Sequence, residues 1–146
     1  MDLHIEPATA ADFESLWRLY ALLEVAGDPV VSLQEAERRY QGILARPDHA
    51  IYLARLDGKV VGTYALVFLP GLPHGARDSA VVEDVVVEPA CRGLGFGKRM
   101  MQDALARSRA RDCYKLVLSS HLQREAAHRF YEGLGFTKHG FSFLMA

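Results

Sequence analysis

The chain has 146 residues, of which 50% are hydrophobic and 24% charged, with a formal net charge of -1 at pH 7. These values predict one domain over residues 1–146, with a core large enough for independent stability. The near-neutral charge argues against a general nucleic-acid or membrane-surface partner. No secretory leader or apolar span of membrane length is recognisable, so we expect a cytoplasmic protein with reduced cysteines.

Metal binding is not expected from the ligand pattern. Cys91 and Cys113 form neither a C-x-x-C motif nor another metal-ligand spacing. The six histidines show no H-x-x-x-H spacing. We therefore predict no metal ligands.

The first half of the chain predicts a strand, two helices and a hairpin. Leu3 to Glu6 forms a short strand ended by Pro7, and the first helix begins near Thr9. Ser32-Leu33-Gln34-Glu35 has the form of a capping box and begins a second helix, which Pro47 stops. Two β-rich runs, Ile51–Leu56 and Lys59–Leu69, flank Asp57-Gly58, a dipeptide typical of a type I′ hairpin turn.

The second half alternates strands and helices. The composition of Pro70–Gly75 predicts a mobile loop. After it we expect a central strand at Val81–Val87, a helix at Gly97–Arg111 and a buried strand at Lys115–Ser119. A helix at Gln123–Glu132 and a final strand at Phe136–Leu144 follow. Gly133 is the expected left-handed residue after the last helix. This order predicts an α/β fold with a central mixed twisted sheet of about six strands and helices on both faces.

A glycine-rich turn joins the central strand to its helix: Arg92-Gly93-Leu94-Gly95-Phe96-Gly97-Lys98. Backbone N–H groups at such a turn, together with the helix dipole, favour an anion such as phosphate. The spacing matches neither the dinucleotide fingerprint, whose third glycine would fall at Lys98, nor a P-loop. Three nearby cations, Arg92, Lys98 and Arg99, are the side chains that we assign to the anion.

Two segments carry a family resemblance. Val85 to Lys98 resembles the strand-turn-helix signature of the GNAT superfamily of acyl-CoA-dependent N-acyltransferases, with its [QR]-x-x-G-x-[GA] core, and Ala127 to Phe136 resembles that family's A-x-x-F-Y-E-x-x-G-F segment. The resemblance implies a GNAT fold and acetyl-CoA as co-substrate. It places the pyrophosphate on the backbone of Gly93, Leu94, Gly95, Phe96, Gly97 and Lys98, and the pantetheine arm beside the backbone of Val85, Val86 and Val87.

Acetyl transfer to an amine requires that the amine lose a proton before it attacks. Glu83 and Asp84 are the candidate bases, because carboxylates in a buried strand are costly unless paired or functional. Regular alternation would let only one of them face a given pocket, and a water chain is an alternative base. The resemblance implies that Tyr131 is the acid that protonates the departing thiolate.

The sequence does not identify the acceptor amine. Glu83 to Val87 with Cys113 to Leu116 is similar to glucosamine-6-phosphate N-acetyltransferases, whereas Ala127 to Tyr131 and the ending Phe141-Ser142-Phe143 are similar to aminoalkylphosphonate N-acetyltransferases. Both imply a small-molecule amine partner that bears an anion, which His74, His121, Arg124 or His128 could bind. The alternatives are a protein or peptide amine acetyltransferase and a non-catalytic acetyl-CoA-binding module. A homodimer is a further expectation, because the exposed edge of the final strand needs cover.

Overall fold

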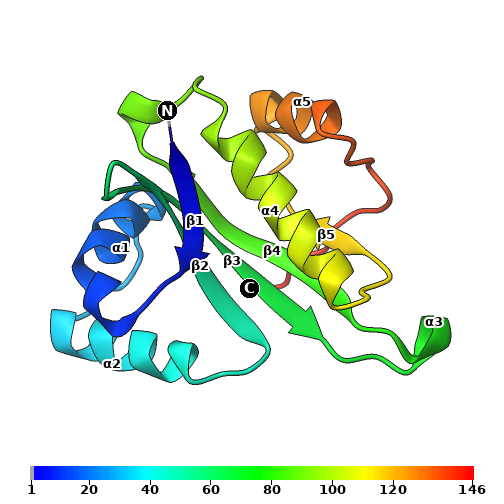
Figure 1. Ribbon diagram of the computed structural model, residues 1–146, viewed down its shortest axis with the longest axis horizontal. Coiled ribbons are helices and arrows are strands. Elements are labelled where there is room, and N and C mark those ends of the chain that lie inside the picture. Colours follow the sequence, from blue (N-terminus) through cyan, green and yellow to red (C-terminus); the bar gives the residue numbers. More distant parts are fainter. Residues whose placement is uncertain (1) are drawn as a thin grey trace.

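The computed structural model describes residues 2–146 and contains one five-stranded sheet with helices on both faces (Figure 1). The strands are β1 (Leu3–Pro7), β2 (His49–Leu56), β3 (Lys59–Leu69), β4 (Ser79–Val87) and β5 (Leu116–Leu118), and they lie in this order across the sheet. The first four strands pair antiparallel, and β4 and β5 pair parallel. The predicted mixed α/β architecture is confirmed.

The helices divide the core into two clusters. On one face, α1 (Phe13–Tyr20) and α2 (Leu33–Leu44) bury side chains such as Leu16, Leu19 and Tyr40 against the sheet. On the other face, α4 (Phe96–Ala110) buries Met100, Met101 and Ala104, and α5 (Glu125–Gly133) packs beside it. The remaining helix, α3 (Pro73–Ala76), is a single turn in the loop between β3 and β4. Each long helix therefore covers the sheet with one apolar face.

Two local predictions are confirmed in detail. Asp57 and Gly58 have φ values of 50° and 81°, as a type I′ turn between β2 and β3 requires. The Ser32 hydroxyl accepts a hydrogen bond from the Glu35 N–H at 3.2 Å and caps the start of α2.

A β-bulge interrupts β4 in the middle of its polar segment. Glu83 pairs with Ala65 and Val86 pairs with Thr63, so Asp84 and Val85 together oppose the single residue Tyr64. Asp84 has a φ of 52°, in the left-handed region. Such a bulge bends its strand and increases the local twist. Aspartate is among the few non-glycine residues that adopt this conformation readily.

Beyond the bulge, β4 and β5 separate. Their parallel pairing covers only residues 80–82 of β4, which lie beside residues 116–118 of β5. In the described part of the chain, the backbone of Val85, Val86 and Val87 therefore has a strand partner, β3, on one side only. The open edge of β4, residues 85–87, offers backbone groups to an extended ligand, although the Val87 carbonyl accepts a hydrogen bond from Arg92 at 3.3 Å.

The prediction of a sixth strand at Phe136–Leu144 is wrong. This segment has no regular secondary structure, although Ser142 Oγ lies 3.1 Å from Ser119 Oγ just past β5. The alternation of Phe141 and Phe143 is typical of a strand, but β5 is only three residues long and offers little edge for pairing. Both phenylalanines are exposed, at 83% and 94% of their surface.

The last helix ends at Gly133, one residue later than predicted, and its left-handed residue lies two residues later. Gly135, with a φ of 99°, takes the left-handed position that was expected for Gly133, which lies inside α5. The Phe136 N–H donates to the Tyr131 carbonyl at 3.1 Å, and the Gly135 N–H donates to the Glu132 carbonyl at 3.0 Å. These two bonds form a Schellman motif. The motif also holds the Phe136 ring 5.9 Å from the Tyr131 ring, centre to centre.

Candidate active site

The glycine-rich turn is open where an anion would approach. Gly93 and Gly95 have φ values of 78° and 81°, and a Cβ built on either residue would have no atom within 4 Å. Glycine is the residue that adopts this backbone conformation without steric cost. The turn therefore leaves an exposed stretch of backbone immediately before α4.

The first turn of α4 adds donors to this stretch. Its first intrahelical bond is donated by the Arg99 N–H to the Gly95 carbonyl at 3.1 Å, so the N–H groups of Phe96, Gly97 and Lys98 have no intrahelical acceptor. These groups and the positive end of the helix dipole suit a phosphate. The turn consequently fits a phosphate or pyrophosphate group.

Gly97 has a packing role that the sequence does not indicate. A Cβ on this residue would meet Cζ of Phe130 at 3.1 Å, closer than most real contacts. The absence of a side chain at Gly97 therefore lets α5 lie against the start of α4. Because Phe130 and Tyr131 are neighbours on α5, this close approach also positions Tyr131.

The three predicted cations behave differently. The Arg99 side chain donates to the Leu3 carbonyl of β1 at 2.8 Å, so its assignment to the anion is wrong and its role is to tie α4 to the sheet. Arg92 donates weakly to the Val87 carbonyl at 3.3 Å. Lys98 is exposed and makes no ion pair within residues 2–146. Arg92 and Lys98 thus remain available near the turn.

Replacing Gly95 with alanine is expected to weaken acetyl-CoA binding about tenfold, because the Cβ would hold a phosphate away from the backbone donors. The left-handed conformation would also cost stability, about 1–2 kcal/mol. Isothermal titration with acetyl-CoA and thermal melting measure the two effects separately.

Gly58→Ala is the matched control. Gly58 has the same φ of 81°, and its Cβ would also lie in open space, but it belongs to the β2–β3 turn. We expect Gly58→Ala to lower the melting temperature by a similar amount and to leave acetyl-CoA affinity unchanged. Equal losses of affinity in the two variants would show that strain, rather than the phosphate contact, causes the effect.

Asp84 faces a cavity on the α1 and α2 side of the sheet. The cavity has a volume of about 390 Å³, and Asp84, Tyr20 and His49 line it together with the aromatic rings of Phe13, Trp17 and Tyr40. Burial, together with the nearby charge of Asp84, raises the pKa of Tyr20. A carboxylate that faces an apolar cavity of this size is suited to receive a proton from a bound amine.

Glu83 lies on the same side of the sheet. Its cross-strand partner Ala65 belongs to the core under α1 and α2, and directly opposed residues of an antiparallel pair share a face. The sequence predicted that both carboxylates are buried, but Glu83 and Asp84 are exposed in the structure. Partial desolvation still raises the pKa of Glu83, and the charge of Asp84 raises it further. Because of the bulge, Glu83 and Asp84 lie on the same side of the sheet, whereas regular alternation would place them on opposite sides. Asp84 lines the cavity and Glu83 does not.

Tyr131 lies on the opposite side of the sheet. It packs against the α4 core with Val85 and Val87 of β4, and its ring lies 5.2 Å from that of Phe130. Burial raises the pKa of Tyr131, and the positive charge of Arg124 acts in the opposite direction. The raised pKa favours the protonated form of the phenol, on the face of the sheet that α4 covers.

A buried hydroxyl lies close to the end of β5. Ser120 Oγ is inaccessible to solvent and has no hydrogen-bond partner within residues 2–146. Buried polar groups without partners are rare in folded proteins.

The polar residues suggested for an anionic acceptor do not come together at a cavity. His74 stacks on Tyr114 at 4.3 Å, and the His128 ring lies 2.8 Å from the His121 carbonyl. Neither they nor Arg124 line the cavity that Asp84 faces or the groove beside it. Instead α2 and β2 contribute Arg39 and His49, which no sequence motif marks.

Residues 2–146 offer neither a metal site nor a membrane-spanning helix. No three His, Cys, Asp or Glu side chains there gather closely enough to hold a metal ion. None of the helices in this range is both long and apolar enough to cross a membrane.

The strand edge, the turn before α4 and the carboxylate facing a cavity suit an acyl-transfer reaction. Comparisons with known proteins show the family to which the chain belongs. Residues 13–136 match the model of the acetyltransferase (GNAT) family. The chain is 32% identical over 134 residues to glucosamine 6-phosphate N-acetyltransferase of Trypanosoma brucei brucei, covering 92% of this chain and 86% of that protein. It is 29% identical over 139 residues to aminoalkylphosphonate N-acetyltransferase of Salmonella typhimurium, covering 95% and 88%.

Solved structures show the same relationship. A protein of Agrobacterium tumefaciens strain C58 superposes with a TM-score of 0.91 at 33% identity, covering 98% of this chain and 99% of that one. An acetyltransferase of Trypanosoma brucei gives a TM-score of 0.84 at 31% identity, covering 99% of each chain. The chain therefore belongs to the GNAT acetyltransferase family and is an acyltransferase enzyme.

Proposed function

We propose that this enzyme transfers the acetyl group of acetyl-CoA to the primary amine of a small phosphorylated or phosphonylated molecule. The observation that carries the proposal is the position of Asp84 at a bulge, where it faces a cavity and directly precedes the open edge of β4 in the chain. The names of the two relatives above, an amino-sugar phosphate and an aminoalkylphosphonate acetyltransferase, support this acceptor class.

Several backbone groups would hold acetyl-CoA. The N–H groups from Gly93 to Lys98 bind its pyrophosphate, Arg92 and Lys98 add positive charge, and the edge of Val85 to Val87 pairs with the pantetheine arm. When bound, acetyl-CoA supplies the acetyl group as a thioester, whose carbonyl carbon is open to attack by an amine. The open edge of β4 thereby orients the donor between the two faces of the sheet.

Two side chains move the protons. Asp84 takes a proton from the acceptor ammonium, directly or through a water, so that the neutral amine forms the new C–N bond. Tyr131 gives its phenolic proton to the sulfur as the C–S bond breaks. The nitrogen keeps one extra proton after the attack, and this proton passes to water as the amide forms. Water returns a proton to Tyr131, and Asp84 releases its own proton to solvent.

The test is thiol release from acetyl-CoA with a panel of amino sugars, amino-sugar phosphates, aminophosphonates, polyamines, amino acids and peptides. We expect turnover with amines that bear phosphate or phosphonate. Turnover with peptides alone would instead identify a protein or peptide acetyltransferase. Tight acetyl-CoA binding without turnover of any amine would identify a non-catalytic binding module.

We also propose a homodimer that buries the C-terminal segment. Four apolar side chains near the end of the chain are more than four-fifths exposed: Phe141, Phe143, Leu144 and Met145. Apolar groups gathered in one short segment are typical of a protein–protein contact. Light scattering should give twice the mass of one chain, and replacing Phe141 and Phe143 with serine should halve that mass.

A further inference from the structure

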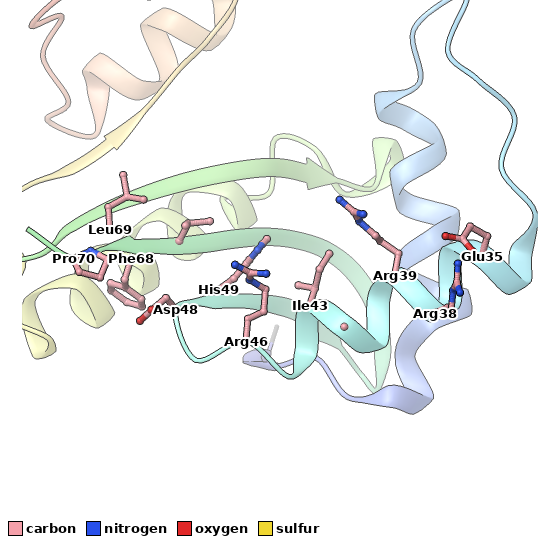
Figure 2. A pocket seen from close by; sticks show the side chains of 12 residues that line it. Glu35, Arg38, Arg39, Ile43, Arg46, Asp48, His49, Phe68, Leu69 and Pro70 are labelled. Atoms are coloured by element: carbon pink, nitrogen blue, oxygen red, sulfur yellow. Dashed lines mark hydrogen bonds and ion pairs between the residues drawn. The ribbon is translucent and has the colours of Figure 1, made fainter.

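A second, larger cavity lies next to the one that Asp84 faces. It is an open groove of about 810 Å³ between α2, the start of β2 and the end of β3 (Figure 2). The groove is lined by three arginines and His49, and by only two carboxylates, those of Glu35 and Asp48. The groove is therefore positively charged, although the whole chain is nearly neutral.

Both carboxylates of the groove are already paired. Glu35 forms an ion pair with Arg38 one turn along α2, and Asp48 lies 2.6 Å from Arg111 Nη2. Within residues 2–146, Arg39 and Arg46 make neither an ion pair nor a side-chain hydrogen bond. Figure 2 shows Arg39 and Arg46 extending over the sheet, apart from the Glu35 and Arg38 pair. Two guanidinium groups are thus uncompensated in one groove.

His49 connects this groove to the carboxylate of the active site. His49 and Arg39 line both cavities, and so do Glu35 and Ile43. Burial lowers the pKa of His49, the charge of Asp84 raises it, and the charge of Arg46 lowers it. The imidazole therefore lies within electrostatic reach of Asp84 on one side and Arg46 on the other. A molecule in this space meets a carboxylate at one end and cations at the other.

We propose that Arg39, Arg46 and His49 bind the phosphate or phosphonate group of the acceptor while its amine lies at Asp84. The proposal rests on the proposed function for the amine and adds the residues that select the anion. Guanidinium groups are well suited to phosphorus oxyanions, because each can donate two parallel hydrogen bonds. Arg38 is not part of this anion site, since Glu35 already neutralises it.

The kinetic test compares acceptors that differ only in the anion, glucosamine 6-phosphate with glucosamine, and 2-aminoethylphosphonate with ethylamine. In Arg46→Gln and Arg39→Gln, we expect KM for the anionic acceptor to rise roughly ten- to hundredfold, as for a lost charged hydrogen bond. The kcat/KM of the uncharged partner and KM for acetyl-CoA should not change. Equal losses for charged and uncharged acceptors would overturn the proposal.

Arg38→Gln is the matched control, one residue from Arg39 on the same helix. It removes the same charge from α2 but should leave KM for the anionic acceptor unchanged. If Arg38→Gln raises KM as much as Arg46→Gln does, the effect is one of overall charge and the assignment to Arg39 and Arg46 fails. Thermal melting of all three variants checks that each is folded.

A binding measurement separates this proposal from the proposed function. Inorganic phosphate, titrated by NMR into the protein without acetyl-CoA, should shift the His49 imidazole signals in the wild type. In Arg46→Gln, the same shift should require at least tenfold more phosphate, about the loss expected for one charged contact. Phosphate binding that depends on Arg46 supports the anion site even if no amine is acetylated. Binding unaffected by Arg39→Gln and Arg46→Gln overturns it even if acetylation occurs.

Discussion

Asp84→Asn is expected to lower kcat/KM for the amine about a hundredfold or more, the usual range for loss of a general base. Asparagine has nearly the same shape and also tolerates the left-handed backbone that Asp84 adopts, so the bulge should survive. The change therefore removes the proton acceptor with little change of geometry. Steady-state kinetics over a range of acceptor concentrations measure the effect, and acetyl-CoA affinity should be unchanged.

Glu83→Gln provides the comparison, and the pH dependence distinguishes the two carboxylates. We expect Glu83→Gln to lower kcat/KM only a few-fold, about what a changed neighbouring charge produces. The charge of Asp84 contributes to the raised pKa of Glu83, so Asp84→Asn should lower that pKa. If Glu83 were the base, Asp84→Asn would keep most of the activity and shift its acidic limb to lower pH. That outcome would reverse our assignment.

Tyr131→Phe is expected to lower kcat about a hundredfold through loss of the general acid, with KM for acetyl-CoA nearly unchanged. The phenylalanine ring keeps the contacts with Phe130 and Phe136, so α5 should stay in place. Because burial raises the pKa of Tyr131, the wild-type phenol stays protonated at neutral and moderately alkaline pH. Deprotonation of Tyr131 should therefore cause no fall in kcat between about pH 7 and pH 10.

Tyr114→Phe is the control for the loss of a phenolic hydroxyl. The ring of Tyr114 stacks on His74 and lies near Arg77 and Lys115, and these contacts do not need the hydroxyl. Its kcat should equal that of the wild type. Full activity in Tyr131→Phe would show that water or another group protonates the thiolate.

Local signals predicted the parts of the site that depend on short stretches of chain. The Asp57-Gly58 turn and the glycine-rich turn before α4 were predictable, because each needs residues that accept a positive φ at fixed positions. The bulge at Asp84 was not, because Val81 to Val87 reads as a regular buried strand. Only the tolerance of aspartate for the left-handed region is visible in the sequence, and that tolerance does not specify a bulge.

Other features depend on contacts between distant segments. The groove combines Arg39 and Arg46 with residues at the end of β3, and arginines on a helix are otherwise typical of a solvated face. Two glycines, Gly133 and Gly135, could each take the left-handed position that ends α5. The contact of Phe136 with Tyr131 favours Gly135. The prediction of a final strand was wrong for a similar reason. Whether a segment pairs as a strand depends on the length of the neighbouring strand as well as on the segment's own residue pattern, and β5 has only three residues.

The bulge also bears on how this chain tolerates changes in length. Between the pairs Glu83–Ala65 and Val86–Thr63, β4 has one residue more than β3. Deleting that residue would restore a regular ladder while leaving the downstream pairs in register. The straightened strand would run on beside β5 and close the gap between them. We therefore expect one-residue deletions to be tolerated in the Pro70–Gly75 loop and excluded at residues 84 and 85 in any active descendant of this sequence.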